Sequence, residues 1–201
     1  MPADACSRRD PFLPSAAIGP GLVVLVVGPS GAGKDAVLRV ARERLAGDRR
    51  FVFPSRVVTR EVNAAEDHVA VTSQEFDELV RCGALAVHWQ AHGLHYGIAR
   101  EIEQFLGAGR CVVFNASRNV VPLVRARHVK AATVLIDAPL PLRAQRLAMR
   151  DRESAQGIGA RLARFVSGTD ALEPDLVICN DGPLECAGEA LTRWLQARFE
   201  G

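Results

Sequence analysis

The sequence predicts a three-layer α/β fold in which a parallel five-stranded sheet carries helices on both faces. One observation is that apolar runs of strand length recur at residues 22–27, 111–114, 132–136 and 176–179, with a fifth strand expected within 51–58. Another is that stretches with helical spacing separate and follow these runs, at residues 34–46, about 99–107, 118–127, 140–150, 156–166 and 184–199. Because strands that alternate with helices pair in parallel, this pattern favours one sheet covered on both sides.

The first strand and helix have the clearest signals. Residues 22–27 form a continuous apolar run, which is typical of a strand buried on both faces. A glycine-rich turn follows, and then Val37, Ala41 and Leu45 recur at helical spacing until Gly47, which is expected to end the helix. A strand, a turn and a helix therefore follow one another directly.

Two stretches depart from the alternation. Residues 56–98 are long and polar, and the capping box at Thr72–Glu75 predicts a small helix within them. The second stretch is basic and contains Arg143, Arg146, Arg150, Arg152 and Arg161. Long insertions in a compact domain are usually functional, so we expect a substrate-binding subdomain at about 56–98 and a lid at about 146–161.

Length and composition limit the remaining possibilities. With 201 residues, of which 48% are hydrophobic, the chain can bury one good core, so residues 21–201 are expected to form a single domain. Residues 1–20 contain proline and charge but no hydrophobic stretch of the signal-peptide type, and we interpret them as a disordered leader.

Several classes of partner are not suggested. The formal net charge is +2 and the sequence contains no basic tail, so nucleic-acid binding is not indicated. No apolar run approaches the roughly 18 residues of a membrane span. Five scattered cysteines without a C-x-x-C pair are expected to be small core residues of a reduced compartment, and a cytoplasmic location follows. The oligomeric state stays open.

The turn after the first strand has the composition of a phosphate-binding loop. It contains Gly28, Pro29, Ser30, Gly31, Ala32, Gly33, Lys34 and Asp35. The glycines let successive backbone N–H groups converge on an anion at a helix N-terminus, and Lys34 is expected to reach the β- and γ-phosphates. This P-loop predicts that the protein binds a nucleoside triphosphate, which we take to be ATP.

Asp35 is unusual, because a serine or threonine that helps to bind Mg²⁺ normally stands at this place in the loop. A carboxylate is also a good ligand for a hard cation, directly or through water. It adds negative charge beside ATP, which a bound metal ion would offset. We therefore expect Asp35 to be linked to Mg²⁺, although an acidic residue in the first turn of a helix is also favoured by the helix dipole alone.

Several motifs together resemble those of the guanylate-kinase-like P-loop kinases, and the match covers about residues 22–199. They are Gly28-Pro29-Ser30-Gly31-Ala32-Gly33-Lys34, Thr59-Arg60, Glu75-Phe76 and Gly93-Leu94-His95-Tyr96-Gly97. The resemblance implies a P-loop kinase fold that uses ATP and Mg²⁺ and has an inserted acceptor-binding subdomain and a lid.

Within this group the chain more closely resembles the ribose 1,5-bisphosphate phosphokinases of phosphonate degradation. The motifs are Gly33-Lys34-Asp35, Val57-Val58-Thr59-Arg60, Glu66–Val71, Trp89–Leu94, Asn115-Ala116-Ser117-Arg118, Arg152-Glu153-Ser154 and Asn180-Asp181-Gly182. This resemblance implies ATP-dependent phosphorylation of a small phosphorylated sugar, with 5-phosphoribosyl 1-diphosphate (PRPP) as the product.

Departures from the guanylate kinase pattern support the sugar-phosphate interpretation. In the implied alignment Val87 stands where guanylate kinases have a guanine-reading glutamate, and Ile98 stands at the guanine-reading serine. His68 and Asn63 replace a phosphate-binding tyrosine and arginine. A site that loses its base-reading polar groups loses that selectivity, so GMP is an unfavourable acceptor.

The resemblance and the residue chemistry give a set of candidate site residues. For the acceptor they are Arg60, His68, Tyr96, Asn115 and Arg118, and for catalysis Lys34, Arg146, Arg150 and Arg161. Arginine grips phosphate through a planar fork, and Arg146 and Arg150 share a helix face. The alternatives include guanylate kinase itself and, from another class, a guanylate-kinase-like interaction module without catalysis. The intact loop lysine argues against the module.

Overall fold

A computed structural model describes residues 19–60, 68–128, 130–150 and 173–200. Its main sheet has the strand order β2-β7-β1-β8-β9, and every pair in it is parallel. The strands are β1 (Leu22–Val27), β2 (Phe51–Val52), β7 (Cys111–Asn115), β8 (Ala131–Asp137) and β9 (Leu176–Cys179). The prediction of a parallel five-stranded sheet is confirmed.

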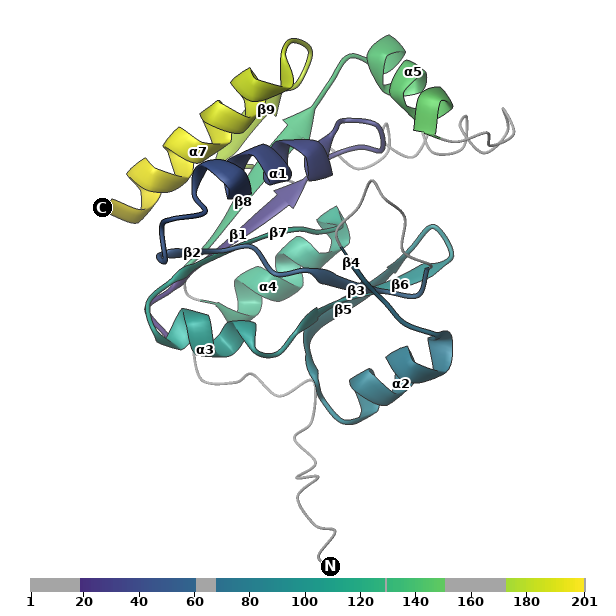
Figure 1. Ribbon diagram of the computed structural model, residues 1–201. Coiled ribbons are helices and arrows are strands. Elements are labelled where there is room, and N and C mark those ends of the chain that lie inside the picture. Colours follow the sequence, from purple (N-terminus) through teal and green to yellow (C-terminus); the bar gives the residue numbers. More distant parts are fainter. Residues whose placement is uncertain (1–18, 61–67, 129, 151–172, 201) are drawn as a thin grey trace, which may run out of the picture.

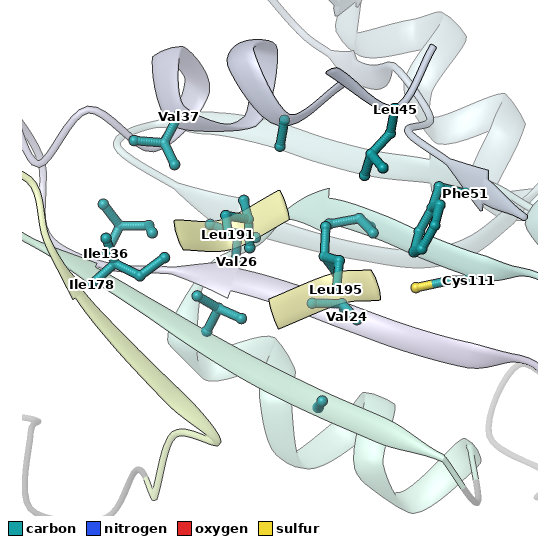
Figure 2. Packing of buried hydrophobic residues seen from close by; sticks show 14 of the residues in the cluster. Val24, Val26, Val37, Leu45, Phe51, Cys111, Ile136, Ile178, Leu191 and Leu195 are labelled. Atoms are coloured by element: carbon teal, nitrogen blue, oxygen red, sulfur yellow. The ribbon is translucent and has the colours of Figure 1, made fainter. Parts of the chain in front are cut away.

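Helices cover both faces of this sheet. Successive side chains of the central strand β1 point to opposite sides, and all of them are apolar, so each face needs a layer that buries it. Leu22, Val24 and Val26 face α1 (Lys34–Arg44) and α7 (Leu184–Glu200), and Figure 2 shows this cluster. Val23 and its odd-numbered neighbours face α3 (Ile102–Gly107), the 3₁₀ turn η1 (Arg118–Val120) and α4 (Val121–Arg127). The three layers expected from the sequence are therefore present (Figure 1).

A second, four-stranded sheet was not predicted. Its order is β4-β3-β6-β5, formed by β3 (Arg56–Val58), β4 (His68–Ala70), β5 (Leu85–Ala91) and β6 (Leu94–Ala99). The turn between β5 and β6 is His92-Gly93, with φ of 53° and 74°, which matches the type I′ turn that two-residue hairpins prefer. The single strand expected within 51–58 is in fact two short strands, one in each sheet.

The predicted small helix is present as α2 (Ser73–Arg81), and Figure 1 shows it on the outer side of the second sheet. Its capping box forms as expected: the Thr72 hydroxyl accepts from the Glu75 backbone N–H, and the Glu75 carboxylate accepts from the Thr72 N–H at 2.7 Å. Phe76 packs with Val57 and Leu85 between helix and sheet. The insertion at 56–98 is therefore a sheet with one helix on one face.

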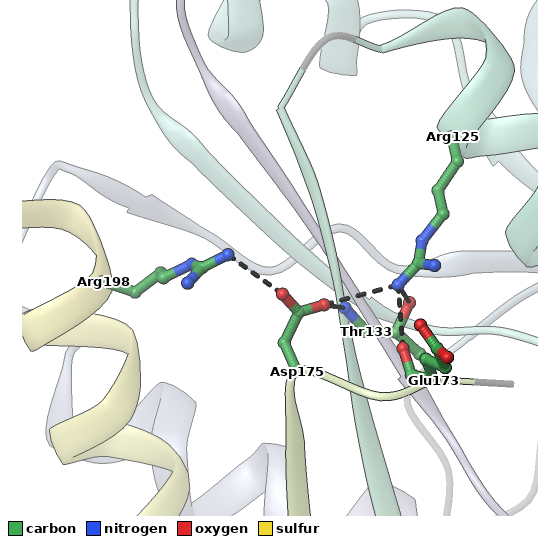
Figure 3. Close-up of polar contacts among 5 residues, drawn as sticks. All are labelled: Arg125, Thr133, Glu173, Asp175 and Arg198. Atoms are coloured by element: carbon green, nitrogen blue, oxygen red, sulfur yellow. Dashed lines mark hydrogen bonds and ion pairs between the residues drawn. The ribbon is translucent and has the colours of Figure 1, made fainter.

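An acidic side chain joins the strands and helices at the amino end of β9. The Asp175 carboxylate accepts hydrogen bonds from the backbone N–H of Thr133 at 2.9 Å, from Arg198 of α7 at 2.9 Å and from Arg125 of α4 at 3.4 Å. Figure 3 shows how these groups converge. The contact holds β9 to its neighbour β8 and to a helix on each face of the sheet.

Other expectations are confirmed with shifted boundaries or lie outside the described residues. Helix α5 (Leu140–Arg150) has the predicted bounds, whereas α1 ends at Arg44, before Gly47. The predicted helix at 156–166 and almost all of the leader fall outside the description. Within the part of the chain that is described, no helix combines the length and apolar character needed to cross a membrane.

The cysteine expectation is wrong for most of the described thiols. Cys111 is buried in β7, and burial raises the pKa of its thiol to about 12. Cys82, Cys179 and Cys186 are exposed. Their sequence context gave no sign of this difference, because each stands near apolar residues.

Candidate active site

The loop between β1 and α1 has the backbone shape expected of a phosphate cradle. Gly31 and Gly33 have φ of 80° and 87°, values that side-chain-bearing residues rarely adopt. A Cβ atom at Gly33 would overlap the side-chain amide nitrogen of Asn180, and one at Gly31 would lie 2.7 Å from the carbonyl oxygen of Arg143. The loop therefore needs glycine at both places, for conformation and for space.

Two of the predicted catalytic cations lie against this loop. The Lys34 Nζ donates to the carbonyl oxygens of Gly28 and Pro29, both at 3.0 Å. Nη1 of Arg146, from α5, donates to the carbonyl of Ala32 at 3.5 Å, and Asn180 Nδ2 donates to the same carbonyl at 2.8 Å. The structure thus brings Lys34 and Arg146 together at the loop, and Figure 1 shows α5 at this end of the sheet.

The other two predicted lid arginines are not placed beside the loop by the structure. Arg150 is the last residue of α5, and its side chain is outside the description. Arg161 and most of the expected lid at 146–161 also lie outside the described residues.

Asp35 is held by two donors from distant parts of the chain. Its Oδ1 accepts from the side-chain amide of Asn115 at 2.7 Å and from Nη2 of Arg56 at 3.1 Å. Asn115 ends β7, which is adjacent to β1, so the carboxyl ends of the two strands place it near the loop. The Arg56 guanidinium offsets the charge of Asp35, so a metal ion is not the sole source of compensation that the sequence suggested.

Arg56 is not among the site residues that the sequence predicted. It opens β3, where only its neighbour Val57 turns toward α2. Adjacent residues of a strand face opposite sides, so Arg56 faces away from the helix. An acidic residue in a phosphate loop is itself a signal that a cation should lie nearby, but the sequence offers 25 lysines and arginines and no way to choose among them.

The same side of the second sheet carries an aromatic pair. Trp89 and Tyr96 are opposite one another on β5 and β6, and their rings stack at 5.6 Å between centroids with an angle of 9°. The guanidinium carbon of Arg56 lies 5.8 Å from the Tyr96 centroid. The predicted acceptor residue Tyr96 is therefore next to Arg56, and Arg56 connects it to Asp35.

The other predicted acceptor residues are distributed around this group. Arg60 follows β3, and its backbone carbonyl lies 3.3 Å from Nε2 of His68, whose side chain is buried. Arg118 begins η1, just after Asn115 and its strand. Asn115 is also buried, and its amide nitrogen is directed at Asp35. Arg60 and His68 thus form one pair, and Asn115 and Asp35 form another.

Val87 and Ile98 lie where the resemblance placed the guanine-reading residues. They are Cα partners on β5 and β6, and both are buried in the cluster that also contains Ile102 and Val120. A register shift between Leu85 and Val87 turns Val87 to this side. Their apolar side chains offer a nucleobase no hydrogen bond.

Comparison with known proteins gives a family match over nearly the whole chain. The sequence model described as guanylate kinase matches residues 21–198. A crystal structure of guanylate kinase from Anaplasma phagocytophilum is similar in fold, with a TM-score of 0.65 over 90% of this chain and 87% of that chain. The sequence identity to that protein is 17%, so this likeness concerns the fold alone.

Other relatives have a much higher sequence identity to this chain than that guanylate kinase. The chain is 46% identical over 177 residues to the ribose 1,5-bisphosphate phosphokinase PhnN of Bradyrhizobium diazoefficiens, covering 88% of this chain and 89% of that protein. It is 49% identical over 170 residues to the protein of the same name from Acidiphilium cryptum, covering 85% and 90%. The family match at residues 21–198 includes the loop, the second sheet and nearly all of the C-terminal helix.

Proposed function

The chain belongs to the guanylate kinase family and, within it, to the ribose 1,5-bisphosphate phosphokinases, and from this membership we propose that it transfers the γ-phosphate of ATP to ribose 1,5-bisphosphate. The products are ADP and PRPP. The observation that carries the choice of acceptor is the buried apolar pair Val87 and Ile98, since a GMP site needs polar groups to read the base.

The proposed reaction needs charge compensation more than it needs a base. The attacking group is an oxygen of the 1-phosphate, which is already anionic near neutral pH. A bond forms between this oxygen and the γ-phosphorus, and the bond from that phosphorus to the β–γ bridging oxygen breaks, so ADP leaves with the electron pair. Positioning two polyanions against their repulsion is the main task, and cations perform it.

Residues 28–35 are the proposed ATP-binding segment, with Lys34 as the cation for the β- and γ-phosphates. The constrained backbone at Gly31 and Gly33 supports this assignment. Arg146, which already contacts the loop, and Arg150 and Arg161 are the proposed lid arginines that compensate charge in the transition state.

The donor set also fits Mg²⁺. Asp35 offers a carboxylate directly after the loop lysine, and we propose that it contributes to the Mg²⁺ site, directly or through water. When bound, Mg²⁺ supplies positive charge to the phosphate oxygens of ATP. The hydrogen bonds from Arg56 and Asn115 orient Asp35.

The proposed acceptor residues are Arg60, His68, Tyr96, Asn115 and Arg118. Arg60 grips one phosphate, and Arg118 is available for the second phosphate of the bisphosphate. His68 contacts the backbone carbonyl of Arg60 and so supports the chain there. Tyr96, which stacks on Trp89, forms one side of the site. With its nitrogen directed at Asp35, Asn115 offers its carbonyl oxygen to a sugar hydroxyl.

The proposed setting is phosphonate degradation in the cytoplasm, with a small phosphorylated sugar as the partner. Guanylate kinase activity is the second candidate because the fold is shared, and an interaction module without catalysis is a third. The intact loop and its lysine disfavour the module.

A direct assay separates these candidates. Purified protein with Mg-ATP is given ribose 1,5-bisphosphate or GMP, and ADP release and the phosphorylated product are measured. We expect fast turnover with the sugar bisphosphate and PRPP as the product. Fast turnover with GMP alone would show a guanylate kinase, and no turnover together with no ATP binding would show an interaction module.

A further inference from the structure

Arg56 lies at the junction of the phosphate loop and the second sheet. Its side chain comes from β3 and is only 12% exposed, and Nη2 donates to Oδ1 of Asp35 at 3.1 Å. Asp35 directly follows Lys34, the residue proposed to bind the β- and γ-phosphates. The guanidinium therefore lies where the proposed site for the reacting end of ATP meets the second sheet, which carries the proposed acceptor residues His68 and Tyr96.

The guanidinium is also fixed from a second side. Its central carbon lies 5.8 Å from the Tyr96 ring centroid, a distance at which a cation is attracted to an aromatic ring. Tyr96 in turn stacks on Trp89. Because Asp35 is itself held by Asn115, both Asp35 and Tyr96 have a further partner of their own. An arginine fixed in this way loses little conformational entropy when it binds a phosphate.

The chemistry of the transfer requires a cation at this junction. The attacking oxygen has to approach the γ-phosphorus to about 3–3.5 Å, which brings two anionic groups into contact. The acceptor phosphate must then occupy the space between the loop and the second sheet. A guanidinium has five N–H donors in a planar fork and grips phosphate with more than one of them.

We infer that Arg56 binds the reacting phosphate of the acceptor, and that Asp35 and Tyr96 hold its guanidinium in the position that this requires. The inference rests on the proposed function and adds a phosphate contact to it. It also gives Asp35 a second role, as the positioning residue that connects the ATP site to the acceptor site. Arg60 and Arg118 then serve the remainder of the bisphosphate.

The test compares Arg56→Met and Arg56→Lys with the matched control Arg81→Met, which changes an exposed arginine of the same insertion. Three quantities are measured: kcat/KM for ribose 1,5-bisphosphate, the Kd of the same sugar from calorimetry without nucleotide, and the Kd of a non-hydrolysable ATP analogue. We expect Arg56→Met to lower kcat/KM by about a hundredfold and weaken sugar binding, with ATP-analogue binding nearly unchanged. Lysine restores part of the loss, since it keeps the charge but not the fork.

A double variant separates phosphate binding from a merely structural role. If Arg56 served only to neutralise Asp35, Arg56→Met with Asp35→Asn would recover the sugar affinity lost in the single variant, measured as the Kd of ribose 1,5-bisphosphate without nucleotide or Mg²⁺. That recovery would overturn the inference. So would an Arg56→Met enzyme that matches the Arg81→Met control while the wild type is active. A wild type that fails to phosphorylate the sugar bisphosphate would overturn the proposed function and, with it, this inference.

Discussion

Val87 and Ile98 face one another on β5 and β6, and both side chains are enclosed by the cluster that joins the second sheet to the main one. Val87 is 8% exposed and Ile98 is 0% exposed. These positions therefore contribute to stability through burial and contribute nothing polar to an acceptor. The two residues that replace the base-reading side chains therefore also pack the two sheets together. For this reason a single polar substitution is not expected to restore base recognition.

Val87→Glu is expected to destabilise the protein without creating GMP kinase activity. A carboxylate placed among these buried apolar side chains loses its hydration, and we expect the free energy of unfolding to fall by about 2–4 kcal/mol. Urea denaturation measures the change. Val69→Glu, at an exposed position of β4 in the same sheet, is the control and should alter stability little. GMP turnover by a stable Val87→Glu protein would contradict the packing argument.

Lys34→Ala and Arg60→Ala are each expected to lower the turnover of ribose 1,5-bisphosphate by at least about tenfold, because Lys34 is the proposed cation for the β- and γ-phosphates of ATP and Arg60 is a proposed cation for a phosphate of the acceptor. The fold should be intact, as judged by circular dichroism and thermal unfolding. Lys130→Ala is the matched control, since Lys130 is exposed and the substitution keeps its backbone carbonyl, which accepts from the backbone N–H of Val23. Unchanged rates in both site variants would remove the proposed site.

The main sheet was predictable because its signal is local and strong. Strands buried on both faces, such as β1 and β7, have continuous apolar sequences. The second sheet was missed because its strands are half-exposed: β5 reads LAVHWQA, with no long apolar run, and its hairpin turn is announced only by Gly93 after a histidine. The capping box gave α2 correctly, since that signal lies within four adjacent residues.

The site also has parts that local sequence predicts and a part that it does not predict. The loop was recognised because the residues that shape it are consecutive, and Asn115 was a candidate because it belongs to a motif of adjacent residues, Asn115-Ala116-Ser117-Arg118. The contact between Asp35 and Arg56 depends on how the second sheet is seated beside the loop, and no local pattern specifies that arrangement. Predicting the arginine partner of Asp35 would have required the tertiary structure.

Asp175→Ala is expected to lower the free energy of unfolding by about 1–3 kcal/mol, because the backbone N–H of Thr133 and two arginines lose a charged acceptor. The side chain is 23% exposed, so water replaces part of what is lost. Glu43→Ala is the control: its pair with Arg39 is exposed and should contribute less than about 0.5 kcal/mol. Equal effects in chemical denaturation would show that Asp175 does not join the helices to the sheet.

His128→Gln is expected to reduce the loss of stability in acid. Burial lowers the pKa of His128 from its ordinary value of 6.5, and the charge of Arg127 lowers it further. The unfolded chain therefore binds a proton at a higher pH than the folded chain, so stability is full above about pH 6.5 and falls below it. The free energy of unfolding, measured at pH 7.5 and at pH 5.5, should differ less in the variant than in the wild type. An equal difference in both would show that His128 does not contribute.

Gly33→Ala tests the shape of the phosphate loop separately from its charge. At φ of 87°, alanine is strained by about 1–2 kcal/mol, and its methyl group would displace the Asn180 amide that donates to Ala32. The N–H groups of the loop would then no longer converge, and we expect a non-hydrolysable ATP analogue to bind at least about tenfold more weakly, although Lys34 is retained. Gly47→Ala is the matched control, since a Cβ there meets nothing within 4 Å. Because both variants add one methyl group, a difference in affinity between them isolates the loop backbone as the source of nucleotide binding, and equal affinities would place that source in Lys34 and the arginines instead.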